Sequence, residues 1–179
     1  MPCRHPTTLP LLLVSMLGVG AVAGCESDNK FPPICPSLAL LKDAADLSRY
    51  AGNGRDVSDL VVQARLTAVP AACSLADPTH VRAQLEVAMD LTRGPAAQGG
   101  RVTAPYFVGV TEGSRVLDEQ DYQLVANFPS NIDQVHVTSD TIDLLLPISQ
   151  QKSAATYQIF VGFRLSPEEL ANNRAHPSQ

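Results

Sequence analysis

The chain has 179 residues and a formal net charge of −5. A mildly acidic chain without basic runs is poorly suited to nucleic acid or to an anionic lipid surface, so the sequence argues against both as partners. Trp is absent and aromatic residues are few, which weakens the case for a sugar-stacking site or an aromatic ligand cage.

The first 24 residues are typical of a bacterial export signal. Arg4 gives a positively charged start, and Leu9–Ala23 is a run of apolar and small residues. A membrane-spanning helix needs about 18 or more such residues, so this run fits the hydrophobic region of a signal peptide better than a permanent span. We therefore predict a signal peptide over residues 1–24.

The junction after this run reads Val22-Ala23-Gly24-Cys25. Small residues fit the narrow cleft of a signal peptidase, and the Cys25 thiol can carry a diacylglycerol thioether. The motif resembles the lipobox of bacterial lipoproteins, with Val22 where Leu is commonest. We predict lipidation of Cys25, because two or three acyl chains anchor a protein stably. The alternative is ordinary secretory cleavage near Ala21 or Ala23, which would leave Cys25 as a plain thiol.

The residue after Cys25 bears on which membrane holds the protein. In the lipoprotein class that the motif resembles, Asp at this position is associated with retention in the inner membrane, whereas this chain has Glu26. We therefore expect anchoring at the periplasmic face of the outer membrane, with the inner membrane as the alternative.

Removal of the signal would leave a chain of ordinary single-domain size. The predicted organisation is a lipidated tether over residues 25–33 and one domain over residues 34–179. Arg4 is the only charged residue in the removed segment, so the mature chain would carry a net charge of −6.

The cysteines support an oxidising compartment. Cys3 leaves with the signal and Cys25 takes the lipid, so Cys35 and Cys73 remain and are predicted to form a disulfide. The closed loop of about 39 residues would stabilise the domain by roughly 4 kcal/mol. A redox pair would prefer Cys-x-x-Cys spacing, and a zinc site would need four nearby ligands.

From Cys35 onward the pattern is mostly extended. Ser37–Lys42 is a short apolar run, and Asp43–Gly54 is predicted to be a polar loop that turns at its glycines. Leu60–Val69 alternates in hydropathy and predicts a half-buried strand. His80–Thr92 alternates over six periods, which favours a strand, although Asp77-Pro78 and Gly94 could cap a helix instead.

The second half predicts more strands. Arg93–Arg101 is a Gly/Pro/Ala loop, and Val102–Thr111 contains Pro105, which confines that position to a sheet edge or a strand start. Further strands are predicted at Arg115–Phe128, Gln134–Leu146 and Ala155–Leu165. In the last of these, the alternation directs Tyr157, Ile159, Val161 and Phe163 to one face. Ser166-Pro167-Glu168-Glu169 is a capping box that opens a short C-terminal helix. The sequence therefore predicts a mainly β fold: an antiparallel β-sandwich, by default immunoglobulin-like in arrangement, with a short C-terminal helix.

Several short segments of the mature chain resemble an uncharacterised family of alphaproteobacterial lipoproteins. They are Cys35-Pro36, Leu41-Lys42-Asp43-Ala44-Ala45, Gly54-Arg55-Asp56-Val57-Ser58-Asp59, Arg93-Gly94-Pro95-Ala96-Ala97, Pro105-Tyr106-Phe107-Val108, Val161-Gly162-Phe163-Arg164-Leu165 and Asn172-Asn173-Arg174. The resemblance spans about Cys25 to Arg174. It implies an envelope location and a small β-rich domain, and it carries over no activity and no catalytic residue.

Two loops are candidate interaction sites, because loops at one end of a sandwich commonly carry binding function. The first contains Arg55, Asp56 and Asp59, and the second follows Arg93. For the first loop we favour an internal role, in which Arg55 pairs with Asp56 or Asp59 and braces the loop, over a recognition surface.

No catalytic, cofactor or metal motif outweighs a structural explanation of the same residues. His136, Ser139, Asp140 and Asp143 could compose a Ser-His-Asp site on paper, but a nucleophile elbow is missing and the alternation turns His136 toward solvent. The acidic run from Asp118 to Asp121 lacks a calcium-loop pattern and is predicted to be a solvated hairpin connection.

The sequence therefore predicts a non-enzymatic lipoprotein without cofactor or metal. It would be held in the bilayer through Cys25 and would act through contacts with an envelope protein. The alternatives are a binding module for a small molecule, lipid or glycan, which requires an apolar pocket, and a hydrolase.

Overall fold

The computed structural model describes residues 34–176. The predicted export signal, the lipidation site Cys25 and the tether over residues 25–33 lie outside the described residues. None of the helices within the described range has the length and apolar character needed to span a bilayer.

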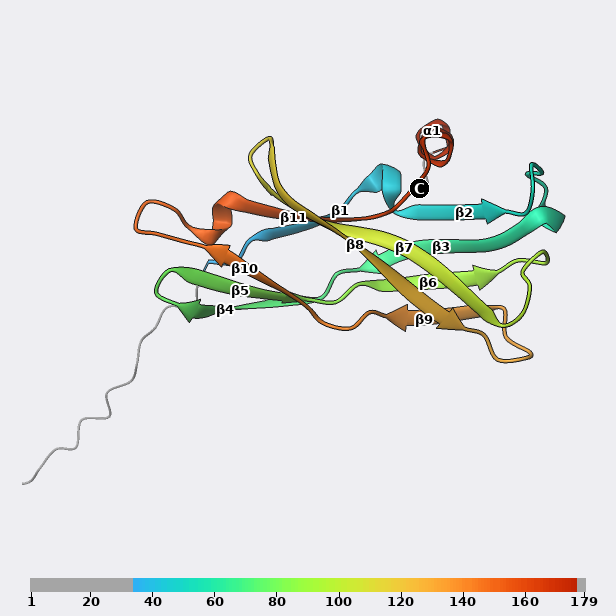
Figure 1. Cartoon of the computed structure of the whole chain (residues 1–179), viewed down its shortest axis with the longest axis horizontal. Helices are drawn as coiled ribbons and strands as arrows, with labels where there is room; N and C mark the ends of the chain where they lie inside the picture. Colours follow the sequence, from blue (N-terminus) through green and yellow to red (C-terminus); the bar gives the residue numbers. More distant parts are fainter. Residues whose placement is uncertain (1–33, 177–179) are drawn as a thin grey trace, which may run out of the picture. The chain divides into compact units, whose positions relative to one another are not determined.

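The fold is mainly β, as predicted, and its described strands form three sheets (Figure 1). In the first sheet the order is β1 (Ser37–Leu40), β11 (Tyr157–Phe163), β7 (Arg101–Glu112) and β8 (Arg115–Asn127). The second is β10 (Ile142–Pro147), β5 (His80–Leu85) and β4 (Ala71–Asp77). The third is β2 (Asp46–Tyr50), β3 (Leu60–Ala68), β6 (Ala88–Arg93) and β9 (Gln134–Thr138). All pairings are antiparallel except that of β1 with β11, which is parallel.

Two predicted strands each contribute to two sheets. His80–Thr92 is extended rather than helical, as favoured, but it divides into β5 and β6, and Gln134–Leu146 divides into β9 and β10. Val87 and Ser139 join these two breaks, because the Val87 amide donates to Ser139 Oγ at 2.9 Å and the Ser139 amide donates to the Val87 carbonyl at 3.0 Å. A strand that bends between sheets in this way closes the corner of a sandwich.

The core lies between the first sheet and the other two. Tyr157, Ile159, Val161 and Phe163 are each at most 1% exposed, so the predicted inward face of β11 is confirmed. The Tyr157 hydroxyl donates to the Pro147 carbonyl at 2.7 Å. Within the described residues no polar or charged residue is buried, so hydrophobic burial is the main source of stability here.

Two strands were not predicted from the sequence. β2 lies where a polar loop was expected, and β4 lies in a segment to which no strand was assigned. Both are edge strands, and their patterns are weak: Leu47 is the one buried residue of β2, and β4 has none. An edge strand can pair through its backbone alone, so hydropathy alternation does not reveal it.

Pro105 lies within β7, not at its start and not at a sheet edge, so that prediction was wrong. The Pro105 carbonyl accepts from the Arg164 amide at 3.0 Å, which places its ring nitrogen on the β11 side, just beyond the last paired residue of β11. The missing N–H therefore breaks no bond with β8. A residue other than proline at position 105 could donate its backbone N–H to the Arg164 carbonyl. This carbonyl accepts instead from Arg49 Nη2 at 3.5 Å.

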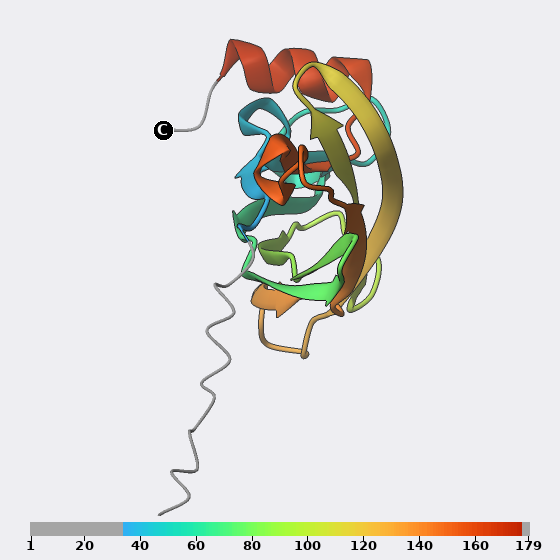
Figure 2. The same ribbon diagram turned by 90° about the vertical axis from the view of Figure 1, so that its left-hand side faces the viewer.

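The C-terminal helix α1 (Pro167–Ala175) begins with the predicted capping box. The Glu169 amide donates to Ser166 Oγ at 3.1 Å, and the Ser166 amide donates to the Glu169 carboxylate at 2.7 Å. In the view turned by 90°, α1 is seen from its side and lies across the top of the sheets (Figure 2). The helix has no buried residue, so polar contacts and a few half-buried side chains hold it in place.

The predicted disulfide between Cys35 and Cys73 is present, with the two Cα atoms 5.9 Å apart. It joins the segment before β1 to the edge strand β4, and therefore to a different sheet.

Candidate functional site

A groove of about 500 Å³ lies between α1, the outer face of β7 and β11, and the short 3₁₀ helix η1 (Lys42–Ala44). Its lining residues are Leu41, Lys42, Asp43, Ala44, Phe107, Phe163, Arg164, Leu165, Leu170 and Arg174. Six of the ten are apolar, and the other four are charged. An apolar floor with a few polar groups is the usual composition of a binding site.

Gly162 allows the floor of this groove to form. A Cβ atom at this position would lie 3.0 Å from the Ala44 Cβ and 3.1 Å from Phe107 Cε1. Both contacts are tighter than ordinary van der Waals packing. Glycine therefore lets the Phe107 ring and η1 approach the surface of β11.

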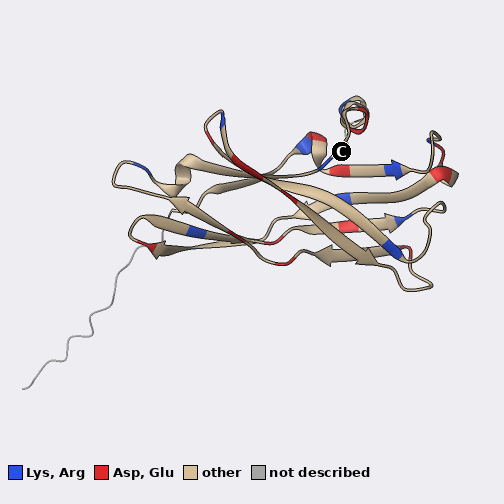
Figure 3. Ribbon diagram, viewed as in Figure 1, with Lys and Arg blue, Asp and Glu red and all other residues tan. Residues whose placement is uncertain are grey.

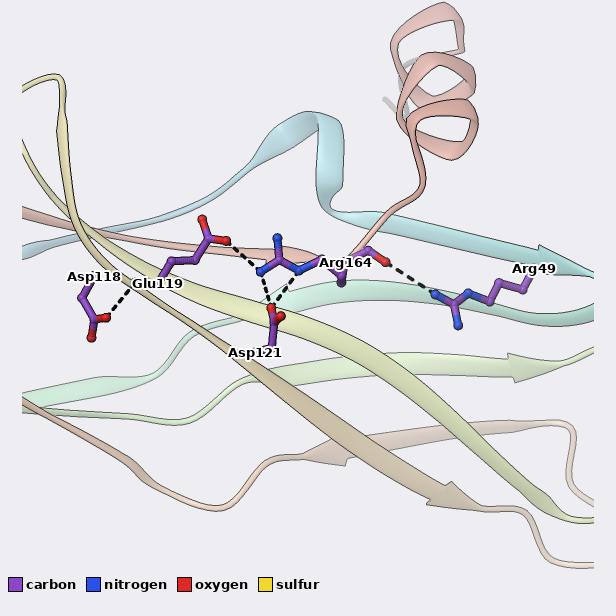
Figure 4. A network of polar contacts seen from close by, with 5 residues as sticks. All are labelled: Arg49, Asp118, Glu119, Asp121 and Arg164. Atoms are coloured by element: carbon purple, nitrogen blue, oxygen red, sulfur yellow. Dashed lines mark hydrogen bonds and ion pairs between the residues drawn. The ribbon is translucent and has the colours of Figure 1, made fainter.

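Arg164 is the centre of the polar network at one side of the groove (Figure 4). Its guanidinium donates to Glu119 Oε1 and to Asp121 Oδ1, each at 2.7 Å, and lies 4.5 Å from the centre of the Phe107 ring. The hydrogen bonds that Arg164 donates to Glu119 and to Asp121 raise the pKa of Arg164 above its usual value. The network fixes Phe107 in the groove by bonding β11 to β8 across β7.

The opposite side of the groove is formed where α1 meets η1. Arg174 Nε lies 2.9 Å from Asp43 Oδ2, and Asn173 Nδ2 donates to the carbonyls of Asp43 and Asp46 at 3.0 and 2.8 Å. Lys42 is exposed at the rim, and its side chain has no polar partner among the residues that the structure describes.

This arrangement is suited to binding. Arg164 and Arg174 are neutralised by neighbouring carboxylates, so the rim carries little net charge, and the floor presents half-buried apolar side chains. Protein interfaces have this layout, with an apolar centre surrounded by polar residues. Within residues 34–176 no group of three or more His, Cys, Asp or Glu side chains is arranged to hold a metal ion.

The first candidate loop lies between β2 and β3, and its internal bonds differ from the prediction. Arg55 pairs with neither Asp56 nor Asp59: its guanidinium lies 3.6 Å from Glu168 and 5.4 Å from the centre of the Tyr50 ring. The loop is braced by backbone bonds instead, from the Asp59 amide to the Asp56 carbonyl and from the Ala51 amide to the Asp59 carbonyl.

The second candidate loop follows β6. Arg93 donates to Asp133 Oδ1 through Nε and Nη2, at 3.1 and 2.6 Å, and lies over the Phe128 ring. The Ala96 amide donates to the Leu60 carbonyl at 2.9 Å, which bonds this loop to the first residue of β3, directly after the first loop. Both loops therefore lie at the same end of the sandwich, away from the end where the described chain begins (Figure 1).

The residues that could compose a catalytic site have other contacts. His136 is exposed, as predicted, and its Nδ1 lies 2.7 Å from Asp90 on the neighbouring strand β6. Ser139 uses its hydroxyl for the sheet corner described above, where it accepts from Val87 and donates to the Asp140 carbonyl at 2.8 Å.

The predicted hairpin connection at Asp118–Asp121 was wrong. These residues lie within β8, and the turn between β7 and β8 is formed by Gly113 and Ser114, where Gly113 has a φ of 58°. A left-handed conformation of this kind suits glycine.

Sequence reasoning did not find the groove or Arg164. The alternation in β11 does place the Arg164 side chain on the face of the sheet opposite to that of the buried Phe163. This is the one feature of the sequence that points to Arg164. Comparisons with models of protein families, with curated proteins and with solved structures found no match to this chain.

Proposed function

We propose that this protein is a non-enzymatic lipoprotein of the bacterial cell envelope, held in a membrane through acylated Cys25 and acting through protein contacts. The motif Val22-Ala23-Gly24-Cys25 supports the anchor. The disulfide between Cys35 and Cys73 fits the same reading, because it suits an oxidising compartment and leaves Cys25 as the one cysteine of the mature chain that is available for lipid. Glu26 favours the outer membrane.

The observation that carries the interaction role is the groove beside α1. Its charged side chains at Arg164 and Arg174 are neutralised, and its apolar floor at Leu41, Phe107 and Leu165 is open to solvent. Burying this floor against a partner would release water from apolar surface without stranding a charge.

Replacing Cys25 with serine is expected to abolish the anchor, because the hydroxyl cannot form the thioether. In cells fed an alkyne analogue of palmitate, the wild-type chain should be labelled and should fractionate with membranes, and Cys25→Ser should do neither. Cys3→Ser is the matched control, since that residue lies in the predicted signal, and it should behave like the wild type. Labelling of Cys25→Ser would contradict the anchor.

A photo-crosslinking residue at Lys42, on the groove rim, is expected to trap a discrete envelope protein in intact cells. The same crosslinking residue at Gln150, which is exposed in the loop after β10, is the control for crosslinks that any exposed position would form. The adduct should disappear when Leu165→Glu is added, because a charge would then occupy the apolar floor. Equal adducts at Lys42 and Gln150 would contradict the use of the groove.

The volume of the groove also supports a second candidate function, a ligand-binding module. About 500 Å³ lies within the usual range of small-molecule sites, roughly 300–1,000 Å³. The crosslinking experiment separates the two functions by mass: a ligand would add a few hundred daltons to Lys42-substituted protein, whereas a protein partner would add kilodaltons.

A further inference from the structure

The outer edge of β8 offers free backbone groups along a regular stretch. Among the strands of residues 34–176, β8 is the last of its sheet and pairs only with β7 (Figure 2). The amide of Phe128, the residue after β8, donates to the Gly100 carbonyl at 2.6 Å. This bond shows which residues of β8 direct their backbone groups toward β7. Alternate residues of β8 from Leu124 to Phe128 therefore bond to β7, and the N–H and C=O groups of Asp121, Gln123 and Val125 point away from it.

These edge groups have no partners in residues 34–176. The open stretch ends at Glu119, whose amide donates to the Asp118 carboxylate at 2.9 Å. The one irregularity in the pairing lies nearer the hairpin tip, between Val110 and Thr111 of β7. Bulges and proline commonly protect a sheet edge, and neither occurs on β8 between Glu119 and Asn127.

A hollow of about 680 Å³ runs beside this edge, between β8 and the segment that joins β9 to β10. Tyr106 and Tyr122 stack at its wall with ring centres 5.4 Å apart. Ser139, Asp140 and Asp143 line the opposite wall. Because side chains alternate along a strand, a strand added at β8 would direct every second side chain into this hollow and the others toward Glu119 and Asp121.

The charge along this edge is acidic, as Figure 3 shows for β8. Five carboxylates lie on β8 and on the opposite wall: Asp118, Glu119, Asp121, Asp140 and Asp143. They are countered by Arg164, which bonds Glu119 and Asp121, and by Arg82, which lies 3.4 Å from Asp143. A second copy paired through β8 would place acid against acid, so this edge disfavours self-association and favours a basic strand.

We propose that the β8 edge binds an extended, lysine- or arginine-bearing segment of a partner protein, which adds to the sheet as a strand beyond β8. Main-chain hydrogen bonds to Asp121, Gln123 and Val125 supply the register. Acidic groups on both sides of the edge select basic side chains, and the tyrosine-lined hollow receives alternate residues. This surface meets the groove beside α1 only at the bonds of Arg164 to Glu119 and Asp121, and none of the residues that line the groove lies on β8. The proposal therefore goes beyond the proposed function, and either one can be wrong while the other holds.

Peptide binding to the purified mature domain tests this proposal. The probes are labelled peptides of about eight residues, long enough to span Glu119–Val125. One alternates Lys with Val, one alternates Glu with Val, and one alternates Lys with Pro. The Lys/Val peptide should bind, and the Glu/Val peptide should not. The Lys/Pro peptide, with equal charge but without strand-forming capacity, should bind at least about fivefold more weakly.

Gln123→Pro is the matching variant, because it removes an outward N–H and leaves the bonds to β7 in place. It should weaken the Lys/Val peptide at least about fivefold, whereas Gln123→Ala, which retains the N–H, should not. Hydrogen exchange on the wild type provides the second readout: the amides of Asp121, Gln123 and Val125 should be protected at saturating Lys/Val peptide. Unchanged exchange at those amides, equal binding of the two basic peptides, or dimerisation in place of peptide binding would overturn the proposal.

Discussion

Replacing both Cys35 and Cys73 with alanine is expected to lower the free energy of unfolding by about 4 kcal/mol, and the melting temperature by roughly 10 °C. The bond spans a sequence separation of 38 residues, so its loss lets the unfolded chain sample many more conformations. It also frees the first residues of the domain from β4, an edge strand without a single buried residue. Urea unfolding of the mature domain measures the change.

A reducing agent provides the control for this prediction. It should shift the unfolding midpoint of the wild type toward that of the double alanine variant, and it should leave the variant itself unchanged. An unfolding midpoint of the wild type that does not respond to reduction would contradict a stabilising disulfide.

Gly94→Ala is expected to cost about 3 kcal/mol or more. A Cβ atom at Gly94 would lie 2.0 Å from the Leu60 carbonyl oxygen and 2.5 Å from its carbon, so one backbone must move. The movement would break the bonds from the Gly94 amide to Val61 and from the Ala96 amide to Leu60, which are both 2.9 Å long. Thermal and urea unfolding should both show the loss.

Gly109→Ala is the matched control for this substitution. Gly109 also lies in the β-sandwich, but an added Cβ would meet one atom within 4 Å, the Asp118 carbonyl oxygen at 3.9 Å. Its unfolding free energy should therefore change by less than about 1 kcal/mol, with a gain from reduced chain entropy as the expected sign. Equal effects of the two substitutions would mean that Gly94 is not held against Leu60.

The two candidate interaction loops differ in how firmly their residues are bonded to the rest of the domain. The loop after Arg93 is bonded to Leu60 and Val61 and its arginine is bonded to Asp133, so it is a braced connection. Arg55 is different, because its partner Glu168 is 83% exposed and 3.6 Å away, which makes this pair a weak one. Of the two arginines, Arg55 in the first loop is therefore the more available to a partner.

The sequence by itself determined the mainly β class, the inward face of β11, the capped C-terminal helix and the pairing of Cys35 with Cys73. Each of these depends on residues close together in the chain, on strict alternation, or on counting cysteines. Its proposals for Cys25 and the membrane also come from local motifs, and they await the labelling experiment.

The tertiary structure decided two of the edge strands and the long-range contacts on which the two binding proposals depend. Nothing local indicates that β2 and β4 are strands, since edge strands bury few side chains and are held by backbone bonds to distant partners. Arg164 becomes the centre of a network only because β7 lies between β11 and β8. This arrangement brings the carboxylates of Glu119 and Asp121, which are more than 40 residues away in the sequence, within hydrogen-bonding distance of its guanidinium. Such contacts depend on sheet order and register, which hydropathy alternation does not encode.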